Sequence, residues 1–320
     1  MSNIRDIAKL AQVSVATVSR VLNNHPYVKD EKRRAVWQAV QELDYQQNIN
    51  AVHLSKGKTF VIGVVLPYIN HPYFSRLLEG IADGAEANGY KLMVIQTNYQ
   101  VDKEVEALDM LRLKQVDGVI FTSRNSPWHI LKEYRAYGPV VVCENKMDNQ
   151  ISTIYIDHYQ AFQRGMELLI QKGHRKIGYC IGRRKGSNSQ KRHEAYRDQL
   201  GKIGEAVTEK WIFERCLHME DGARVLREWR DMKEAPTALV VTNDLVAAGI
   251  ILEAEKLGVS IPDNLAVIGF DDQPLAEALQ ITTIQLPLPT IGKEAFQQAT
   301  QDVKVIHKSL PFELVERKTV

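Results

Sequence analysis

The sequence predicts an α/β protein with a small helical head and a larger two-lobed body built on doubly wound parallel sheets. In residues 3–43 apolar side chains recur at helical spacing around short breaks. From Phe60 onward, apolar strand-like runs alternate with helical segments. The alternation comes in two tandem series, one from about residue 60 and one from about residue 159. Each series predicts a parallel sheet that is covered by helices on both faces.

The head begins with a helix–turn–helix pattern. Asn3 can cap the first helix, with Asp6 at the third helical position, where an acid suits the helix dipole. Gln12 and the residue after it make the turn, and Ser14 caps the second helix. A third helix over Glu31–Leu43 completes the head. The inward apolar positions of the first two helices are Ile4, Ile7, Ala8, Ala11, Val18, Val21 and Leu22.

The second helix leaves a face of small, hydroxyl and guanidinium side chains directed outward. These residues are Val15, Ala16, Thr17, Ser19 and Arg20. Residues 1–58 hold nine Lys and Arg against five Asp and Glu, a net charge of +4, whereas residues 59–320 carry a net charge of −2. A small basic head with such a face is suited to the DNA major groove, on a body that contributes little to nucleic-acid binding.

The composition excludes several other classes of protein. Cys143, Cys180 and Cys216 are widely spaced and show neither a CxxC nor a Cys/His metal pattern, so we expect free thiols in a reducing compartment. No signal peptide opens the chain and no apolar run could span a membrane, so we expect a cytoplasmic protein. Walker A, GxGxxG, HExxH and GxSxG motifs are absent, and we expect no enzyme, catalytic residue, metal or cofactor.

Residues 4–8, 13–23 and 26–28 closely resemble the head of LacI/GalR-type repressors, and the resemblance extends over essentially the whole chain. It implies a DNA-binding head at residues 1–46, a hinge helix or linker at 47–58, and a body similar to a periplasmic sugar-binding protein. Two departures stand in the head. Gln12 occupies a turn position where the family usually has glycine, and Lys29 precedes the third helix where Ser or Thr is usual.

The resemblance further implies that the two lobes are interleaved along the chain, with ligand bound in the cleft between them. We expect the chain to cross between lobes near Asp157, near Gln285–Pro289, and before a final strand Pro311–Arg317. The amino-terminal lobe is then formed by residues 59–158 with about 288–308, and the carboxy-terminal lobe by residues 159–287 with about 309–320.

By the same resemblance, the head holds the DNA contacts. The resemblance implies that base edges are contacted by Val15, Ala16 and Arg20. It implies that phosphates are contacted by Ser14, Thr17, Ser19, Asn23 and Tyr27. Leu54 matches the leucine that family members wedge between base pairs from the minor groove. A nine-residue hinge helix cannot hold itself together in water, so its stretch is either a flexible linker or a helix that forms on DNA. The second alternative requires two hinges packed together, hence a homodimer and a palindromic operator.

The resemblance places effector contacts at Tyr73, Phe74, Glu144, Arg192, Asn243 and Asp271, and we add His71, which precedes the first two. Carboxylates, an amide and a guanidinium suit polyol recognition, although Phe74 could equally be a core residue. Asp244 is favoured as a helix cap, and Asp271 or its neighbour Asp272 as part of a turn. The aromatic usually found shortly before Gly222 is missing, which weakens the expectation of a sugar-stacking platform.

These observations predict a sequence-specific transcriptional regulator, a repressor of carbohydrate-utilisation genes whose effector is a sugar or sugar phosphate. The cationic stretch Arg183–Arg192 is either a solvated loop or a receptor for an anionic effector. Lys114–Ile120 resembles the catabolite-control branch of the family, in which a phosphorylated carrier protein is the corepressor. A pure sugar-binding protein with a vestigial head is the third alternative. For the dimer we expect buried apolar faces at Leu77, Leu78, Ile81, Ile250 and Ile251.

Overall fold

The computed structural model describes residues 3–46, 57–301 and 304–320. The chain divides into two compact units, Met1–Lys58 and Thr59–Val320, which we call the head and the body. Leu54, the expected minor-groove wedge, lies outside the described residues. No helix in the described ranges is long and apolar enough to cross a membrane.

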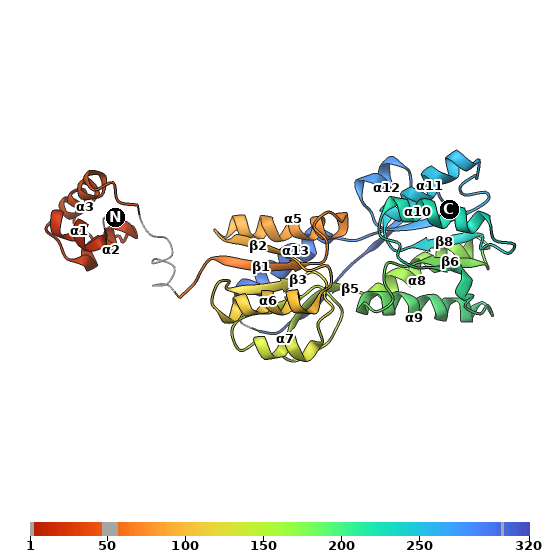
Figure 1. Cartoon of the computed structure of the whole chain (residues 1–320), viewed down its shortest axis with the longest axis horizontal. Helices are drawn as coiled ribbons and strands as arrows, with labels where there is room; N and C mark the ends of the chain where they lie inside the picture. Colours follow the sequence, from red (N-terminus) through yellow and green to blue (C-terminus); the bar gives the residue numbers. More distant parts are fainter. Residues whose placement is uncertain (1–2, 47–56, 302–303) are drawn as a thin grey trace. The chain divides into compact units, whose positions relative to one another are not determined.

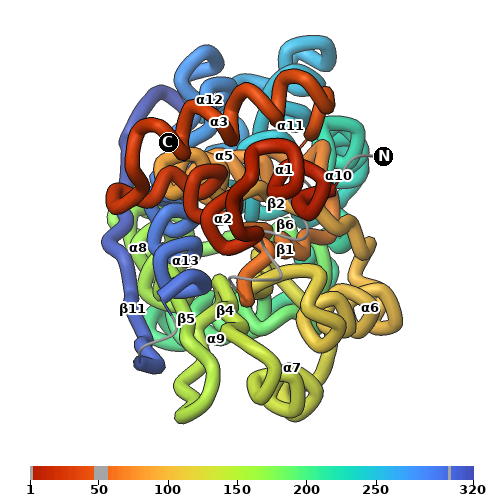
Figure 2. Tube along the Cα trace, turned by 90° about the vertical axis from the view of Figure 1, so that its left-hand side faces the viewer, coloured from red at the N-terminus to blue at the C-terminus, as the bar shows by residue number. Residues whose placement is uncertain are grey.

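The described part of the head is a bundle of three helices, α1 (Ile4–Leu10), α2 (Val15–Leu22) and α3 (Asp30–Glu42), which are visible in Figures 1 and 2. Its core consists of Ile7, Ala8, Val18, Val21, Val36 and Ala39. The expected caps are present. The Asn3 side chain accepts from the Arg5 amide at 2.8 Å and the Asp6 carboxylate accepts from the Asn3 amide at 2.9 Å, while Ser14 Oγ accepts from the Thr17 amide at 3.2 Å.

The amino-terminal lobe of the body is a six-stranded parallel sheet in the order β11-β5-β4-β3-β1-β2. Its strands are β1 (Val61–Leu66), β2 (Lys91–Gln96), β3 (Gly118–Phe121), β4 (Val140–Val142), β5 (Ser152–Ile156) and β11 (His307–Leu310). Its helices are α5 (Pro72–Ala87), α6 (Val101–Arg112), α7 (Trp128–Tyr134) and α13 (Leu288–Gln301). Helices α5 and α13 cover one face with Ile62 and Val64, and α6 and α7 cover the other with Val65 and Val119.

The carboxy-terminal lobe repeats this plan with the order β12-β10-β9-β8-β6-β7, in which only β12 is antiparallel to its neighbour among the described strands. Its strands are β6 (Ile177–Cys180), β7 (Ile212–Phe213), β8 (Ala238–Val241), β9 (Ala266–Asp271), β10 (Thr282–Gln285) and β12 (Glu313–Val315). Its helices are α8 (His158–Gln171), α9 (Ser187–Lys202), α10 (Met219–Arg230), α11 (Asp244–Leu257) and the short α12 (Pro274–Ala278).

The chain passes between the two lobes of the body where β5 leads into α8, where β10 leads into α13, and where β11 leads into β12 (Figure 1). Each sheet is therefore assembled from segments that are far apart in the sequence. The parallel strands of both lobes direct their carboxyl ends and following loops to one edge of each sheet, the edge at which α/β proteins bind ligands.

A close helix pair packs against one face of each sheet, α5 with α13 and α10 with α11. A Cβ at Gly80 would overlap the Pro289 carbonyl, and a Cβ at Gly249 would overlap the Met219 carbonyl, so glycine is what allows the backbones to approach. The apolar side chains of α5 and α11 pack in the core of the body, against these partner helices and the sheets. Leu77, Ile81 and Ile250 are fully buried inside the body, so the expectation that they form a dimer face is wrong.

Candidate functional site

The outward face of α2 is presented as the helical pattern predicts. Val15, Ala16 and Arg20 are exposed while Val18 and Val21 are buried. Ser14 Oγ and Thr17 Oγ1 share a hydrogen bond of 2.9 Å, and the Asn23 side-chain amide donates to the Ser19 carbonyl at 2.9 Å, so the polar side chains on this face are already oriented.

Tyr27, an expected phosphate contact, follows α2 on a loop and is 88% exposed. Arg33 on α3 holds that loop by donating to Asn24 Oδ1 at 3.0 Å and to the His25 carbonyl at 2.8 Å. The sequence gives no periodic signal for this role of Arg33, because it depends on where the loop returns to α3. The exposed tyrosine is thus presented on an anchored loop beside α2.

A cavity of about 180 Å3 opens between the two lobes of the body. It brings together all seven residues that the sequence nominates, His71, Tyr73, Phe74, Glu144, Arg192, Asn243 and Asp271. The lining also includes Arg183, Gly186, Ser187, Asn188 and Ser189 of the cationic stretch, and six residues that sequence reasoning missed, Tyr68, Tyr99, Ser123, Gly182, Leu217 and Thr242. A weak signal was available for some of them, since Thr242 lies directly after strand β8 and Tyr68 and Ser123 lie two residues after strands β1 and β3.

The amino-terminal lobe contributes an aromatic wall. Phe74 is only 7% exposed but lines the cavity, with the Tyr73 ring 5.1 Å away and the Tyr68 ring 6.5 Å away, both edge-on. His71 caps α5, its Nδ1 accepting from the Tyr73 amide at 3.3 Å. Burial, and then the nearby His218 of the other lobe, lower the pKa of His71 to about 4. His71 therefore presents a neutral imidazole to the cleft at neutral pH.

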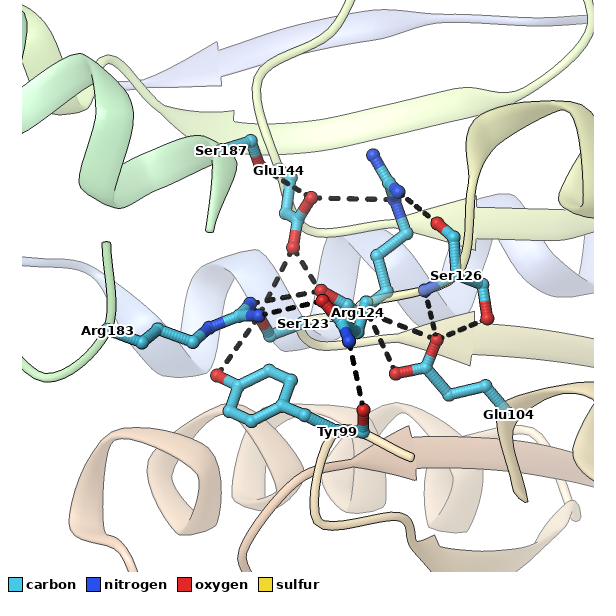
Figure 3. A network of polar contacts seen from close by, with 9 residues as sticks. Tyr99, Glu104, Ser123, Arg124, Ser126, Glu144, Arg183 and Ser187 are labelled. Atoms are coloured by element: carbon cyan, nitrogen blue, oxygen red, sulfur yellow. Dashed lines mark hydrogen bonds and ion pairs between the residues drawn. The ribbon is translucent and has the colours of Figure 1, made fainter. Parts of the chain in front are cut away.

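Glu144 is the acceptor at the centre of the inter-lobe contacts (Figure 3). It is 2% exposed and accepts from Ser123 Oγ at 3.2 Å, the Arg124 amide at 3.1 Å and Ser187 Oγ at 2.6 Å. The Arg124 guanidinium lies 3.5 Å away and neutralises it. Because Ser187 belongs to the other lobe, Glu144 both faces the cleft and joins its two walls.

Arg192 is a buried guanidinium held by neutral groups. It donates to His158 Nδ1 at 3.2 and 3.3 Å and to the Thr242 carbonyl at 3.5 Å, and it lies 4.3 Å from the centre of the Phe270 ring. Burial, and then the charge of Arg192, hold the pKa of His158 well below its usual value, so the imidazole accepts rather than donates. Because these hydrogen-bond partners are neutral, the positive charge of Arg192 remains available to interact with groups inside the cleft.

Asp271 ends β9 with a φ of 101°, a conformation that non-glycine residues rarely adopt. Its Oδ2 accepts from Gln273 at 3.1 Å, whereas its buried Oδ1 has no hydrogen-bond partner among the described residues. Burial, and then Asp244, raise the pKa of Asp271 well above its usual value. Asp272 turns away and pairs with Arg317 at 2.8 Å. The unpartnered Oδ1 leaves Asp271 free to form a hydrogen bond with a ligand hydroxyl.

The expectation that Asp244 caps α11 is wrong. Asn243 is the cap, its Oδ1 accepting from the Val246 amide at 2.9 Å. Asp244 is instead the first helical residue and is buried, accepting from the Gln273 amide at 2.8 Å and Thr283 Oγ1 at 2.7 Å. Burial raises the pKa of Asp244 to about 7. Asn and Asp are both common N-cap residues, so the sequence alone does not choose between Asn243 and Asp244. The choice depends on Gln273 and Thr283, which follow or belong to β9 and β10 and bind the Asp244 carboxyl.

The cationic stretch Arg183–Arg192 is not wholly a loop, because α9 begins inside it at Ser187. Helix geometry sends its cations in different directions. Arg183 and Arg192 line the cleft, whereas Arg184 pairs with Glu209 at 3.0 Å and Glu214 at 2.7 Å on the surface. Lys191 pairs with Glu194 at 2.8 Å, and Lys185 is exposed.

Two family models together match most of the chain. The model described as "Bacterial regulatory proteins, lacI family" matches residues 3–48. The model described as "Periplasmic binding proteins and sugar binding domain of LacI family" matches residues 59–312.

Relatives and solved structures match over the full length. The chain is 46% identical to the uncharacterized HTH-type transcriptional regulator YkvZ of Bacillus subtilis (strain 168), covering all of both chains. It is 35% identical to catabolite control protein B of the same organism, covering 96% of this chain and 98% of that one. The structure of the Lac repressor dimer bound to operator and an anti-inducer superimposes with a TM-score of 0.85 at 24% identity, over 99% of this chain and 98% of that one.

Proposed function

This chain belongs to the LacI family of bacterial regulatory proteins and is a transcriptional regulator rather than an enzyme, and from that premise we propose that it is a homodimeric repressor of carbohydrate-utilisation genes. Two heads bind a palindromic operator in the nucleoid, and a sugar or sugar phosphate in the inter-lobe cleft sets the operator affinity. The observation that carries the cleft assignment is the convergence of Glu144, Arg192 and the unpartnered Asp271 oxygen in one cavity with an aromatic wall.

For the operator contact, Val15, Ala16 and Arg20 read base edges in the major groove, and the oriented hydroxyls around them position the backbone. For the dimer, the exposed Val94 on β2 offers an apolar position. Among the described strands β2 pairs only with β1, which leaves one edge of the sheet open to a second copy.

The test of operator recognition is Arg20→Ala in the full chain, with duplexes first selected from genomic fragments. A guanidinium that reads one base is worth about 1–3 kcal/mol, so we expect that loss on the selected operator and a relaxed preference at one base pair, measured by fluorescence anisotropy. Arg34→Ala removes an equal charge from α3 and should weaken all duplexes by a similar factor. Equal losses on every operator variant for Arg20→Ala would contradict its role as a base reader, and no binding to any duplex would favour a pure sugar-binding protein.

The effector is identified by a thermal-shift screen of sugars, sugar phosphates and nucleobases. A ligand at one hundred times its dissociation constant stabilises the protein by about 2.7 kcal/mol. Calorimetry on a sugar and its phosphate then separates the neutral from the anionic effector. Arg183 and Arg192 favour the phosphate, and tighter binding of the neutral sugar would reject it.

The catabolite-control alternative is favoured by the 35% identity to catabolite control protein B over nearly the whole chain. In that case a phosphorylated carrier protein is the corepressor and contacts the outer surface of the body. Operator affinity that rises with the phosphorylated carrier but not with its unphosphorylated form would support this alternative over a small-molecule effector.

A further inference from the structure

We propose that Arg183 is a strap that holds the two lobes of the sensor together across the cleft. This inference deepens the proposed function, since it names a regulatory element of the same cleft, but the contacts that carry it belong to the protein alone. Arg183 projects from the carboxy-terminal lobe, after β6, and its guanidinium lies against the amino-terminal lobe (Figure 3).

The guanidinium is held on its face and at its edge. Its central carbon lies 3.5 Å from the centre of the Tyr99 ring, within the range of a strong cation–π contact. Its Nη2 donates to the Arg124 carbonyl at 3.0 Å and to Ser123 Oγ at 3.4 Å, and its Nη1 donates to Asn125 Oδ1 at 3.4 Å. A flat, forked donor is the side chain that can satisfy a ring and these acceptors at once.

The part of the amino-terminal lobe that contacts Arg183 is held in place by contacts within that lobe. Glu104, a fully buried carboxylate on α6, accepts from the Asn125 amide at 2.8 Å and the Ser126 amide at 2.7 Å, and it also contacts Ser126 Oγ. Tyr99 has a left-handed φ of 60° and its hydroxyl donates to Ser123 Oγ at 3.3 Å. Ring and loop are therefore tied to each other within one lobe.

Two features beside Arg183 on its own lobe support the strap: the lack of a side chain at Gly186, and a second contact between the lobes made by Ser187. A Cβ at Gly186 would come within 3.1 Å of the Arg183 guanidinium, so glycine leaves space for the side chain. Ser187, the next residue, donates to Glu144 at 2.6 Å across the cleft. A ligand that engages this Glu144 oxygen would lie beside Ser187, so ligand and strap contact the same wall of the cleft.

Arg184 provides a matched control inside the same loop. It makes its ion pairs with Glu209 and Glu214 within its own lobe, and all three side chains are at least 45% exposed. Replacing either arginine by alanine removes the same charge and the same length of side chain. Only Arg183→Ala removes a contact between lobes.

The experiment measures the distance between lobes in the full-length, ligand-free protein. Spin labels are attached to cysteines introduced at the exposed residues Glu133 on α7 and Lys202 on α9, the three native cysteines being buried. Electron–electron double resonance should give a shifted and broadened distance distribution for Arg183→Ala, and a wild-type distribution for Arg184→Ala. Tyr99→Leu, which removes the ring but leaves the arginine, should reproduce the change. A wild-type distribution in both Arg183→Ala and Tyr99→Leu would overturn the strap.

Operator affinity separates the failure of the strap from that of the proposed function. If lobe closure sets operator affinity, Arg183→Ala changes the operator dissociation constant by about fivefold or more and Arg184→Ala does not. A wild-type chain that binds no duplex would refute the proposed function, while the distance distributions would still decide on the strap.

Discussion

Two buried carboxyl groups, Asp244 and Asp271, lie on either side of Gln273, which donates its backbone amide to the first and its side-chain amide to the second. A Cβ at Gly269 would overlap Asp244 Oδ1, so the acid is enclosed by backbone as well as by its partners. Desolvation raises the pKa of both groups, and that of Asp244 reaches about 7. This pair of carboxyl groups therefore binds more protons in the folded protein than in the unfolded chain.

This proton makes stability depend on pH in a defined direction. Between about pH 4 and pH 7 the folded protein holds a proton on Asp244 that the unfolded chain has lost, so the free energy of unfolding falls as the pH rises. The full effect is on the order of 4 kcal/mol. We expect Asp244→Asn to flatten the decline, as measured by urea unfolding at several pH values.

The control is Asp231→Asn, which replaces an exposed aspartate at the end of α10 and should leave the wild-type slope. His71 works in the opposite sense, because its pKa of about 4 makes stability rise with pH up to about 6.5. The comparison is therefore the difference between each variant and the wild type. An unchanged slope in Asp244→Asn would show that another group takes up the proton.

At the residue scale, the sequence predicts well what depends on near neighbours. The caps at Asn3 and Ser14 follow from residues three positions apart, and Gln12 adopts the positive φ, 49°, that the usual glycine suggests. Lys29 precedes α3 and makes no side-chain cap, as its type implies. Asp244 was misjudged and Arg183 was not singled out, because their partners lie on segments that meet only in the tertiary structure.

At the scale of elements, the glycines of the paired helices are the positions with least tolerance. We expect Gly249→Ala to lower the free energy of unfolding by roughly 1–3 kcal/mol, because its Cβ would overlap the Met219 carbonyl and backbone cannot move aside as a side chain can. Gly201→Ala is the matched control, since nothing lies within 4 Å of its Cβ and alanine favours helix by up to about 1 kcal/mol. Urea unfolding followed by tryptophan fluorescence compares the two variants. The same change in the free energy of unfolding for both, with the same sign, would contradict the packing argument.

Long apolar runs made most elements predictable, and short or polar ones did not. Strands β1, β3, β8 and β9 are short apolar runs of the kind that strands buried on both faces contain. Strands β5, β10 and β11 contain Ser, Thr or Lys. They form strands because they pair with a neighbouring strand, and their own sequence pattern does not predict it. The start of α9 at Ser187 was missed because Ser and Asn are as common in loops as in first turns.

At the scale of the whole molecule, coupling between cleft and operator must be reciprocal. If an effector changes operator affinity by some factor, typically about 5- to 150-fold, the operator changes effector affinity by the same factor. Calorimetry of the effector with free protein and with the operator complex measures this directly. As a control, residues 59–320 alone should bind the effector with the affinity of the free protein. If the factor for operator affinity and the factor for effector affinity were unequal, the two sites would not be coupled by one equilibrium.

The interleaving of the two lobes has a consequence for synthesis. Strands β11 and β12 lie at the edges of different sheets, and both come from the last fourteen positions, 307–320. On the ribosome, neither sheet can acquire this edge strand until the segment 307–315 has been translated, so a premature stop near codon 300 would leave both halves of the sensor unfinished at once.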